Sequence, residues 1–221
     1  MLPHKNKDNA INFKRISQSE LEKYHALLTC LCKDYKDAKC MGLSELATLH
    51  NAGICLLSLQ NDLMLLREQL VFASHKPAQS VLARHIAIAV YEGAKDLPII
   101  FGKRYRDALG AAEVDNRIFD ELGTVIKPVS QFYTKYKNGL SSIRNYLAAH
   151  REHIGWVQVS LIGSIEPTNI LLLTMEFMRL LVPIVQFNIR ATAEVHQFTY
   201  YKLIEDKRKS EKSDGTTPTD Q

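Results

Sequence analysis

A sustained seven-residue repeat of leucine between Ser44 and Ser74 is the feature that most restricts how this chain can fold. Leucine returns at every seventh position, and a second apolar series runs three positions later: Leu49, Leu56, Leu63, Leu70 and Ala52, Leu59, Leu66, Ala73. Apolar residues spaced by alternating steps of three and four share one side of an α-helix. Leu57, Met64 and Val71 widen that side, so the spacing predicts a long helix near the centre of a helical bundle.

The rest of the chain reads as further helices separated by breaks in the apolar pattern. A capping box at Ser17 and Glu20 predicts a helix that runs to about residue 36. Apolar periods and prolines predict the other helices at 44–74, 78–97 with a shorter run to 109, 116–126, 129–151 and 168–205, the last kinked at Pro183. Residues 156–162 alternate as a short extended segment would.

These segments predict an all-α fold, an up-and-down bundle of about five or six helices that forms a single domain at 16–206. A chain of 221 residues with 46% apolar composition is long enough for one sizeable core. Residues 1–15 are polar, and 207–221 are charged and rich in turn-forming residues. We therefore expect a flexible N-terminus and a disordered C-terminal tail.

Charge and hydropathy narrow the functional classes. The 28 basic and 24 acidic residues give a net charge of +4, which is too small to indicate a nucleic-acid partner by itself, so any polyanion must bind a local patch. The most apolar segment, 170–189, contains Glu176, Arg179, Pro183 and Gln186. Charged side chains are costly at the centre of a bilayer, so we expect a buried core helix and no membrane association.

Cysteine usage predicts the cellular compartment. Cys30, Cys32, Cys40 and Cys55 all lie in the first quarter of the chain, and residues 1–14 lack the apolar run of a secretory leader. A reducing, cytoplasmic location and free cysteines are expected. The tight cysteine pairs of structural zinc sites are missing from the sequence, and it contains none of the common nucleotide-binding or hydrolase motifs. Neither a metal nor a cofactor is predicted.

The stretch LSSIRNYLAAH at 140–150 is the one place where the sequence assembles a plausible site. It ends the predicted helix 129–151, whose apolar stripe is Phe132, Tyr136, Leu140, Ile143 and Leu147, with His150 on the same line. Lys137, Arg144 and Arg151 are spaced by sevens and form a basic ribbon beside it. Lys135, Tyr133 and Tyr146 can add contacts to phosphate or stack on a base.

His150 has two interpretations at this point. It can be a structural histidine near the negative end of a helix dipole, or a functional partner of Arg144. Six helical positions separate the two residues by about 120° in direction and about 9 Å along the axis. One regular helix cannot aim both at one phosphate, so the helix end must distort or a second protomer must contribute its own copy. The same spacing recurs at Arg190 and His196, without the asparagine and the small residues.

With Asn145 directly after Arg144 and Ala148-Ala149 before His150, the stretch resembles the motif of the HEPN superfamily, helical proteins of which many are ribonucleases. The similarity is greatest to the abortive-infection and toxin types, and it implies a homodimer whose two motifs face one cleft. It also implies a metal-independent endoribonuclease, a hydrolase of RNA, with a toxin–antitoxin or anti-phage defence role and an antitoxin or regulatory protein as partner.

The residue types suit cleavage of RNA by the adjacent 2′-hydroxyl. Histidine can accept and donate a proton near neutral pH, which contributes roughly 10²–10⁴ in rate. The arginine fork can hold non-bridging phosphate oxygens, and Asn145 can orient either group. The products would be a 2′,3′-cyclic phosphate and a 5′-hydroxyl. His150, Arg144 and Asn145 are therefore the predicted catalytic residues, and Lys137, Tyr146 and Arg151 the predicted RNA contacts.

Two alternatives stay open. The chain can be a catalytically silent HEPN-like bundle that binds nucleotide or RNA or acts as an adaptor. It can also be a helical interaction protein in which Arg144 and His150 only tie helices together. Glu92 has two interpretations as well, since it lies on a helix flank where it can meet a basic group across the bundle or remain solvated.

Overall fold

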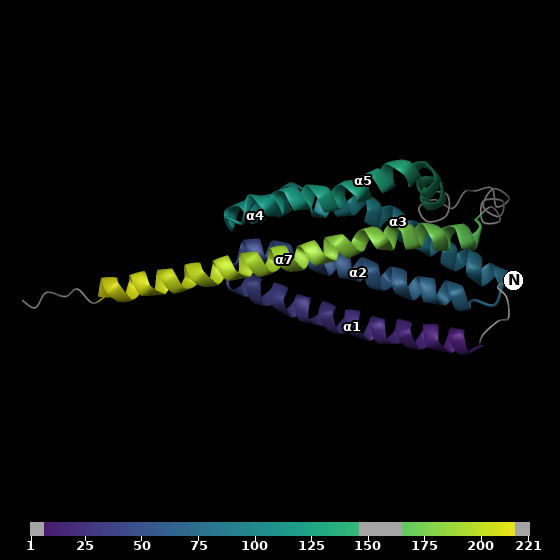
Figure 1. The fold of residues 1–221 in the computed structure, drawn as a ribbon, viewed down its shortest axis with the longest axis horizontal. Helices are drawn as coiled ribbons and strands as arrows, with labels where there is room; N and C mark the ends of the chain where they lie inside the picture. The colour runs from purple at the N-terminus through teal and green to yellow at the C-terminus, as the bar shows by residue number, and fades with distance from the viewer. Residues whose placement is uncertain (1–6, 146–164, 215–221) are drawn as a thin grey trace, which may run out of the picture.

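The structure is a computed structural model, and it describes residues 7–145 and 165–214. In this part of the chain all regular structure is helical (Figure 1). The helices, labelled as in the figure, are α1 (Lys7–Cys40), α2 (Ser44–Phe72), α3 (Lys76–Ile100), α4 (Lys103–Ala111), α5 (Asn116–Arg144) and α7 (Pro167–Asp214). The prediction of an all-α helical bundle is confirmed.

Four helices enclose the core. α2 and α5 each pack against both α3 and α7, so the four form a closed bundle. α1 packs chiefly on the outer side of α2, and short α4 lies against one end of α2. The leucine repeat of α2 is at the centre as predicted, because Leu49, Leu56, Leu63 and Leu70 are all at most 3% exposed. On α7, Phe177, Leu181, Ile184, Phe187 and Ala191 are fully buried opposite them.

Local signals set two helix ends that shape the bundle. Gly42 has φ +72°, and the amide of Leu43 donates to the carbonyl of Ala38 at 2.9 Å. This is the Schellman arrangement, in which a glycine takes the left-handed conformation that ends a helix and turns the chain back. At the start of α5, Asp115 Oδ1 accepts from the Arg117 amide at 2.8 Å and caps the helix.

Several predicted boundaries were wrong. α1 begins at Lys7, ahead of the predicted capping box, and α7 continues to Asp214 and projects past the end of the bundle (Figure 1). Parts of both segments predicted to be unstructured are therefore helical; the lysines and arginines in both are good helix formers. α5 runs through Pro128 instead of splitting there. A proline removes one helical hydrogen bond, and burial of Leu122 and Val129 on either side offsets that cost. The predicted extended segment, 156–162, lies outside the described residues.

α7 is apolar on two sides. One stretch within Pro167–Glu205 has the length and mean hydropathy, 1.8, of a membrane-crossing helix, and 33% of that stretch is buried. Core helices of soluble proteins, which are mostly buried, meet the same criterion; here one face of α7 is buried in the bundle and most of the stretch is not. Leu172, Met175, Val182 and Ile189 are nevertheless exposed on the other face.

Candidate functional site

An ion pair between α3 and α5 forms the centre of the candidate site. The Arg144 Nε donates to Glu92 Oε1 at 2.8 Å, at the point where α5 ends. Both side chains are partly exposed, 39% for Arg144 and 33% for Glu92. The other Glu92 oxygen lies 3.4 Å from Lys95 Nζ. Of the two interpretations of Glu92, the structure therefore shows the contact with a basic group across the bundle.

Asn145 completes the described part of the motif. Its side-chain Oδ1 accepts from Arg144 Nη1 at 3.1 Å. Its backbone N–H donates to the carbonyls of Ser141 and Ser142, so Asn145 stays attached to the helix end. Arg144 Nη2 makes no hydrogen bond to the residues that the structure describes. Glu92 and Asn145 thus hold the guanidinium at Nε and at Nη1, and among the described residues Nη2 is the nitrogen left to bind an anion.

Lys135, a basic residue of α5 outside the ribbon, is neutralised by an ion pair. Lys135 Nζ is 3.3 Å from Glu176 Oε1 on α7, and Tyr136 donates to the other oxygen of the same carboxylate at 2.8 Å. These contacts raise the pKa of Lys135, through Tyr136 first and Glu176 second. Lys137 is exposed. Among the described residues the ribbon is therefore carried by Lys137 and Arg144.

Tyr133 is also engaged by a neighbour. Its ring packs against the ring of Tyr91 on α3 in a tilted arrangement, with ring centroids 5.7 Å apart. Tyr91 directly precedes Glu92 in the sequence. The ring pair and the Arg144–Glu92 ion pair both join α3 to α5. Tyr133 serves packing here, which leaves less of its surface for stacking on a base than the sequence suggested.

Three predicted site residues, Tyr146, His150 and Arg151, lie outside the described residues, so the meeting of His150 with Arg144 stays a prediction. The second pair with the same spacing shows how a regular helix separates such residues. Arg190 of α7 forms an ion pair with Glu121 on α5. His196 instead lines a cavity against α1 and α2. Six positions on a straight helix therefore place the arginine and the histidine against different neighbours.

That cavity contains a titratable group that the sequence did not single out. It measures about 390 Å³, and Asp34, His50 and His196 are among its lining residues. The His50 side chain is buried, and its Nδ1 has no hydrogen-bond partner among the described residues. Burial lowers the pKa of His50, Asp34 raises it, and His196 lowers it further. The apolar repeat marks the neighbouring Leu49 as buried but gives no signal for His50 itself.

No metal-binding arrangement is found within the part of the chain that the structure describes, as judged by groups of three or more histidine, cysteine or acidic side chains. The cysteines are free, as predicted, and are exposed or partly exposed.

Comparisons of the chain with protein-family models, curated proteins and solved structures find no match.

Proposed function

We propose that this chain is a metal-independent endoribonuclease of HEPN type that cleaves RNA by attack of a 2′-hydroxyl, with Arg144, Asn145 and His150 as its catalytic residues. The observation that carries the proposal is the geometry of Arg144. Glu92 and Asn145 fix its guanidinium at the end of α5. The Nη2 nitrogen makes no hydrogen bond to the described residues. A fixed cation with an unpaired Nη2 donor suits stabilisation of a charged phosphorane.

His150 supplies the proton transfer in this proposal. It follows Arg144 by six residues, and the separation of Arg190 from His196 on α7 illustrates why one straight helix is unsuited to bring the two together. A homodimer in which one protomer's Arg144 faces the partner subunit's His150 resolves the mismatch. The cytoplasmic location, the toxin or anti-phage role and an antitoxin or regulatory partner rest on the resemblance of the motif.

The decisive experiment is RNA cleavage in the presence of EDTA with identification of the product ends. The wild-type protein should yield 2′,3′-cyclic phosphate ends, and His150→Ala should lower the rate by roughly 10²–10⁴. His196→Ala is the matched control, because His196 ends the second pair of the same spacing, and it should cleave at the wild-type rate. Intact RNA in all reactions, or equal cleavage by wild type and His150→Ala, refutes the proposal.

The second candidate is a catalytically silent bundle that binds RNA or nucleotide or acts as an adaptor. It is favoured by the pairing of the basic groups on α5, since Glu92 already holds Arg144 and Glu176 holds Lys135. It predicts RNA binding that weakens with salt and is reduced in Lys137→Ala and Arg144→Ala, without cyclic-phosphate products.

A further inference from the structure

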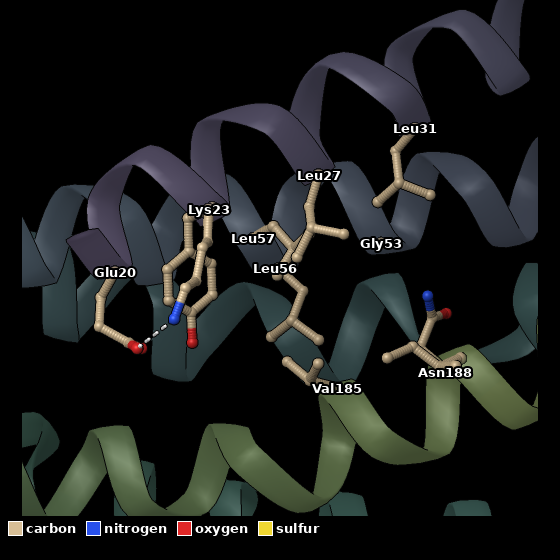
Figure 2. Close-up of a pocket in the computed structure, with 11 residues that line it drawn as sticks. Glu20, Lys23, Leu27, Leu31, Gly53, Leu56, Leu57, Val185 and Asn188 are labelled. Carbon is tan, nitrogen blue, oxygen red and sulfur yellow. Dashed lines mark hydrogen bonds and ion pairs between the residues drawn. The ribbon is translucent and has the colours of Figure 1, made fainter.

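A groove lined by α1, α2 and α7, away from the Glu92–Arg144 pair, has the properties of a ligand site. α1 and α7 both pack on α2, and the groove lies between them (Figure 2). Its volume is about 320 Å³, at the lower end of the range for small-molecule sites. Its walls are mainly apolar: Leu27, Leu31, Leu56, Leu57, Val185 and Ile189. The helices α3 and α5, which carry the Glu92–Arg144 pair, contribute none of its lining residues.

The side-chain amide of Asn188 lines this groove and uses only its oxygen in a hydrogen bond. Asn188 is 5% exposed, and its Oδ1 accepts from the hydroxyl of the buried Tyr105 at 2.9 Å. Its Nδ2 makes no hydrogen bond to the described residues, and Figure 2 shows this nitrogen directed from α7 toward α2 near Gly53. An acceptor atom of a ligand placed here would gain a hydrogen bond that the described residues leave unmade.

The absence of a side chain at Gly53 lets Asn188 and Leu31 approach α2 closely at this end of the groove. A Cβ added to Gly53 would lie 2.8 Å from Asn188 Nδ2 and 3.3 Å from Leu31 Cδ1. Any side chain at this position would therefore fill the space in front of the amide nitrogen. The glycine and the amide donor therefore lie together at one end of the groove wall.

A second donor faces the groove from α1. The Tyr24 hydroxyl accepts from Gln60 Nε2 at 2.6 Å, and its own proton has no acceptor among the described residues. At the rim, Lys23 Nζ and Glu20 Oε1 lie 3.4 Å apart, so the charges of the two side chains offset each other. The groove thus offers apolar walls and two neutral donors, with no net charge to attract an ionic ligand.

We propose that this groove binds a small, neutral, largely apolar molecule with a carbonyl-type oxygen that accepts from Asn188 Nδ2. A volume of about 320 Å³ is at the small end of ligand sites, so the ligand must be small. The apolar part lies against the leucine side chains of α1 and α2, and the oxygen reaches the amide. Tyr24 supplies a second donor for a ligand with a second acceptor.

The test compares three compounds with the same nine-carbon chain: nonan-2-one, nonanoate and nonylammonium. Isothermal titration with the full-length protein should give the tightest binding for the neutral ketone, with each ion at least tenfold weaker because the groove offers it no counter-charge. In ¹⁵N-resolved spectra the ketone should shift the side-chain amide signals of Asn188. Equal or tighter binding of either ion, or no binding of the ketone, overturns the proposal.

Variants of both walls locate the binding. Leu27 and Ile189 are 55% and 63% exposed, so Leu27→Asp and Ile189→Asp should fold, as checked by thermal unfolding, and each should weaken ketone binding at least tenfold. Leu172→Asp is the control, since Leu172 is 61% exposed on α7 and does not line the groove. Unchanged affinity in both wall variants overturns the proposal. Conversion of a dimer to a monomer by Leu27→Asp would also overturn it, because the groove would then bind a second copy.

Discussion

At the scale of single residues, the strength of the Glu92–Arg144 contact bears on whether Arg144 has a structural or a functional role. The two side chains are 33% and 39% exposed, and solvent weakens an ion pair at such exposure. A pair that mainly held α3 to α5 would need to contribute more than surface pairs usually do. The modest stabilisation expected from it is compatible with an arginine that serves another purpose.

A double-mutant cycle measures that contribution. From Glu92→Ala, Arg144→Ala and the double variant, urea unfolding should give a coupling free energy of about 0.2–1 kcal/mol. The control is Glu20 with Lys23, a more exposed pair 3.4 Å apart, for which we expect a coupling close to zero. A strong loss of stability in Arg144→Ala with no effect on RNA would instead support the helical interaction protein.

His50 should make stability depend on pH. Burial depresses its pKa in the folded protein despite the opposing charge of Asp34, and His196 depresses it further. The unfolded chain, with a histidine pKa near the ordinary 6.5, therefore binds a proton more readily than the folded one. The contribution of neutral His50 to the free energy of unfolding is fully present above the pKa of the unfolded state. It is lost as pH falls from about 6.5 toward the pKa of the folded state.

Chemical denaturation at a series of pH values between 7.5 and 5 tests this dependence. The free energy of unfolding should fall with pH in the wild-type protein and fall less steeply in His50→Gln. His85→Gln is the comparison, because His85 is an exposed residue of α3, and it should follow the wild-type profile. Parallel profiles for wild type and His50→Gln would show that His50 is not the source.

At the scale of helices, one chemical change should act in opposite directions at two glycines. At Gly139, inside α5, an added Cβ meets nothing within 4 Å, so Gly139→Ala should raise the free energy of unfolding by about 0.5–1 kcal/mol through helix propensity. At Gly102, a Cβ would lie 2.9 Å from the carbonyl oxygen of Ile99 and 3.0 Å from that of Pro98. Gly102→Ala should lower the free energy by about 1–3 kcal/mol.

Urea midpoints of the two variants and the wild type provide the measurement. The wild-type midpoint should fall between those of the variants, with similar slopes for all three proteins. A stabilising Gly102→Ala would mean that the junction of α3 and α4 shifts to admit a methyl group at little cost.

The predicted helices show what sequence periodicity captures. The leucine repeat identified α2 and its buried face because burial on one side of a helix must recur with the helical period. The break predicted at Pro128 failed because proline costs one hydrogen bond locally, whereas the choice between one helix and two also depends on packing by residues distant in sequence. For the same reason the flank of Glu92 was predictable but its partner was not. The sequence reveals which residues share a helix face. The packing of α3 against α5 determines that Glu92 meets Arg144.

At the scale of the whole molecule, four long helices form a closed set, α1 packs outside it, and the short α4 packs against one end of α2. α2, α3, α5 and α7 share the core, whereas α1 packs chiefly on α2. Ala38 is the only fully buried residue of α1 among those whose exposure is described. The free energy that holds α1 in place therefore comes from a much smaller buried apolar surface than the one that holds the other four.

This inequality predicts that α1 opens before the core unfolds. In native-state hydrogen exchange, amides at 24–34 of α1 should exchange through an opening that costs clearly less free energy than global unfolding and depends weakly on denaturant. Amides at 53–66 of α2 and 86–97 of α3, both in the closed set of four, should share the larger value. Equal protection in α1 and α2 would show that the helices unfold as one unit. A ligand in the groove between α1 and α7 should raise the opening free energy of α1 and leave that of α2 and α3 less affected, because α1 supplies one wall of the groove.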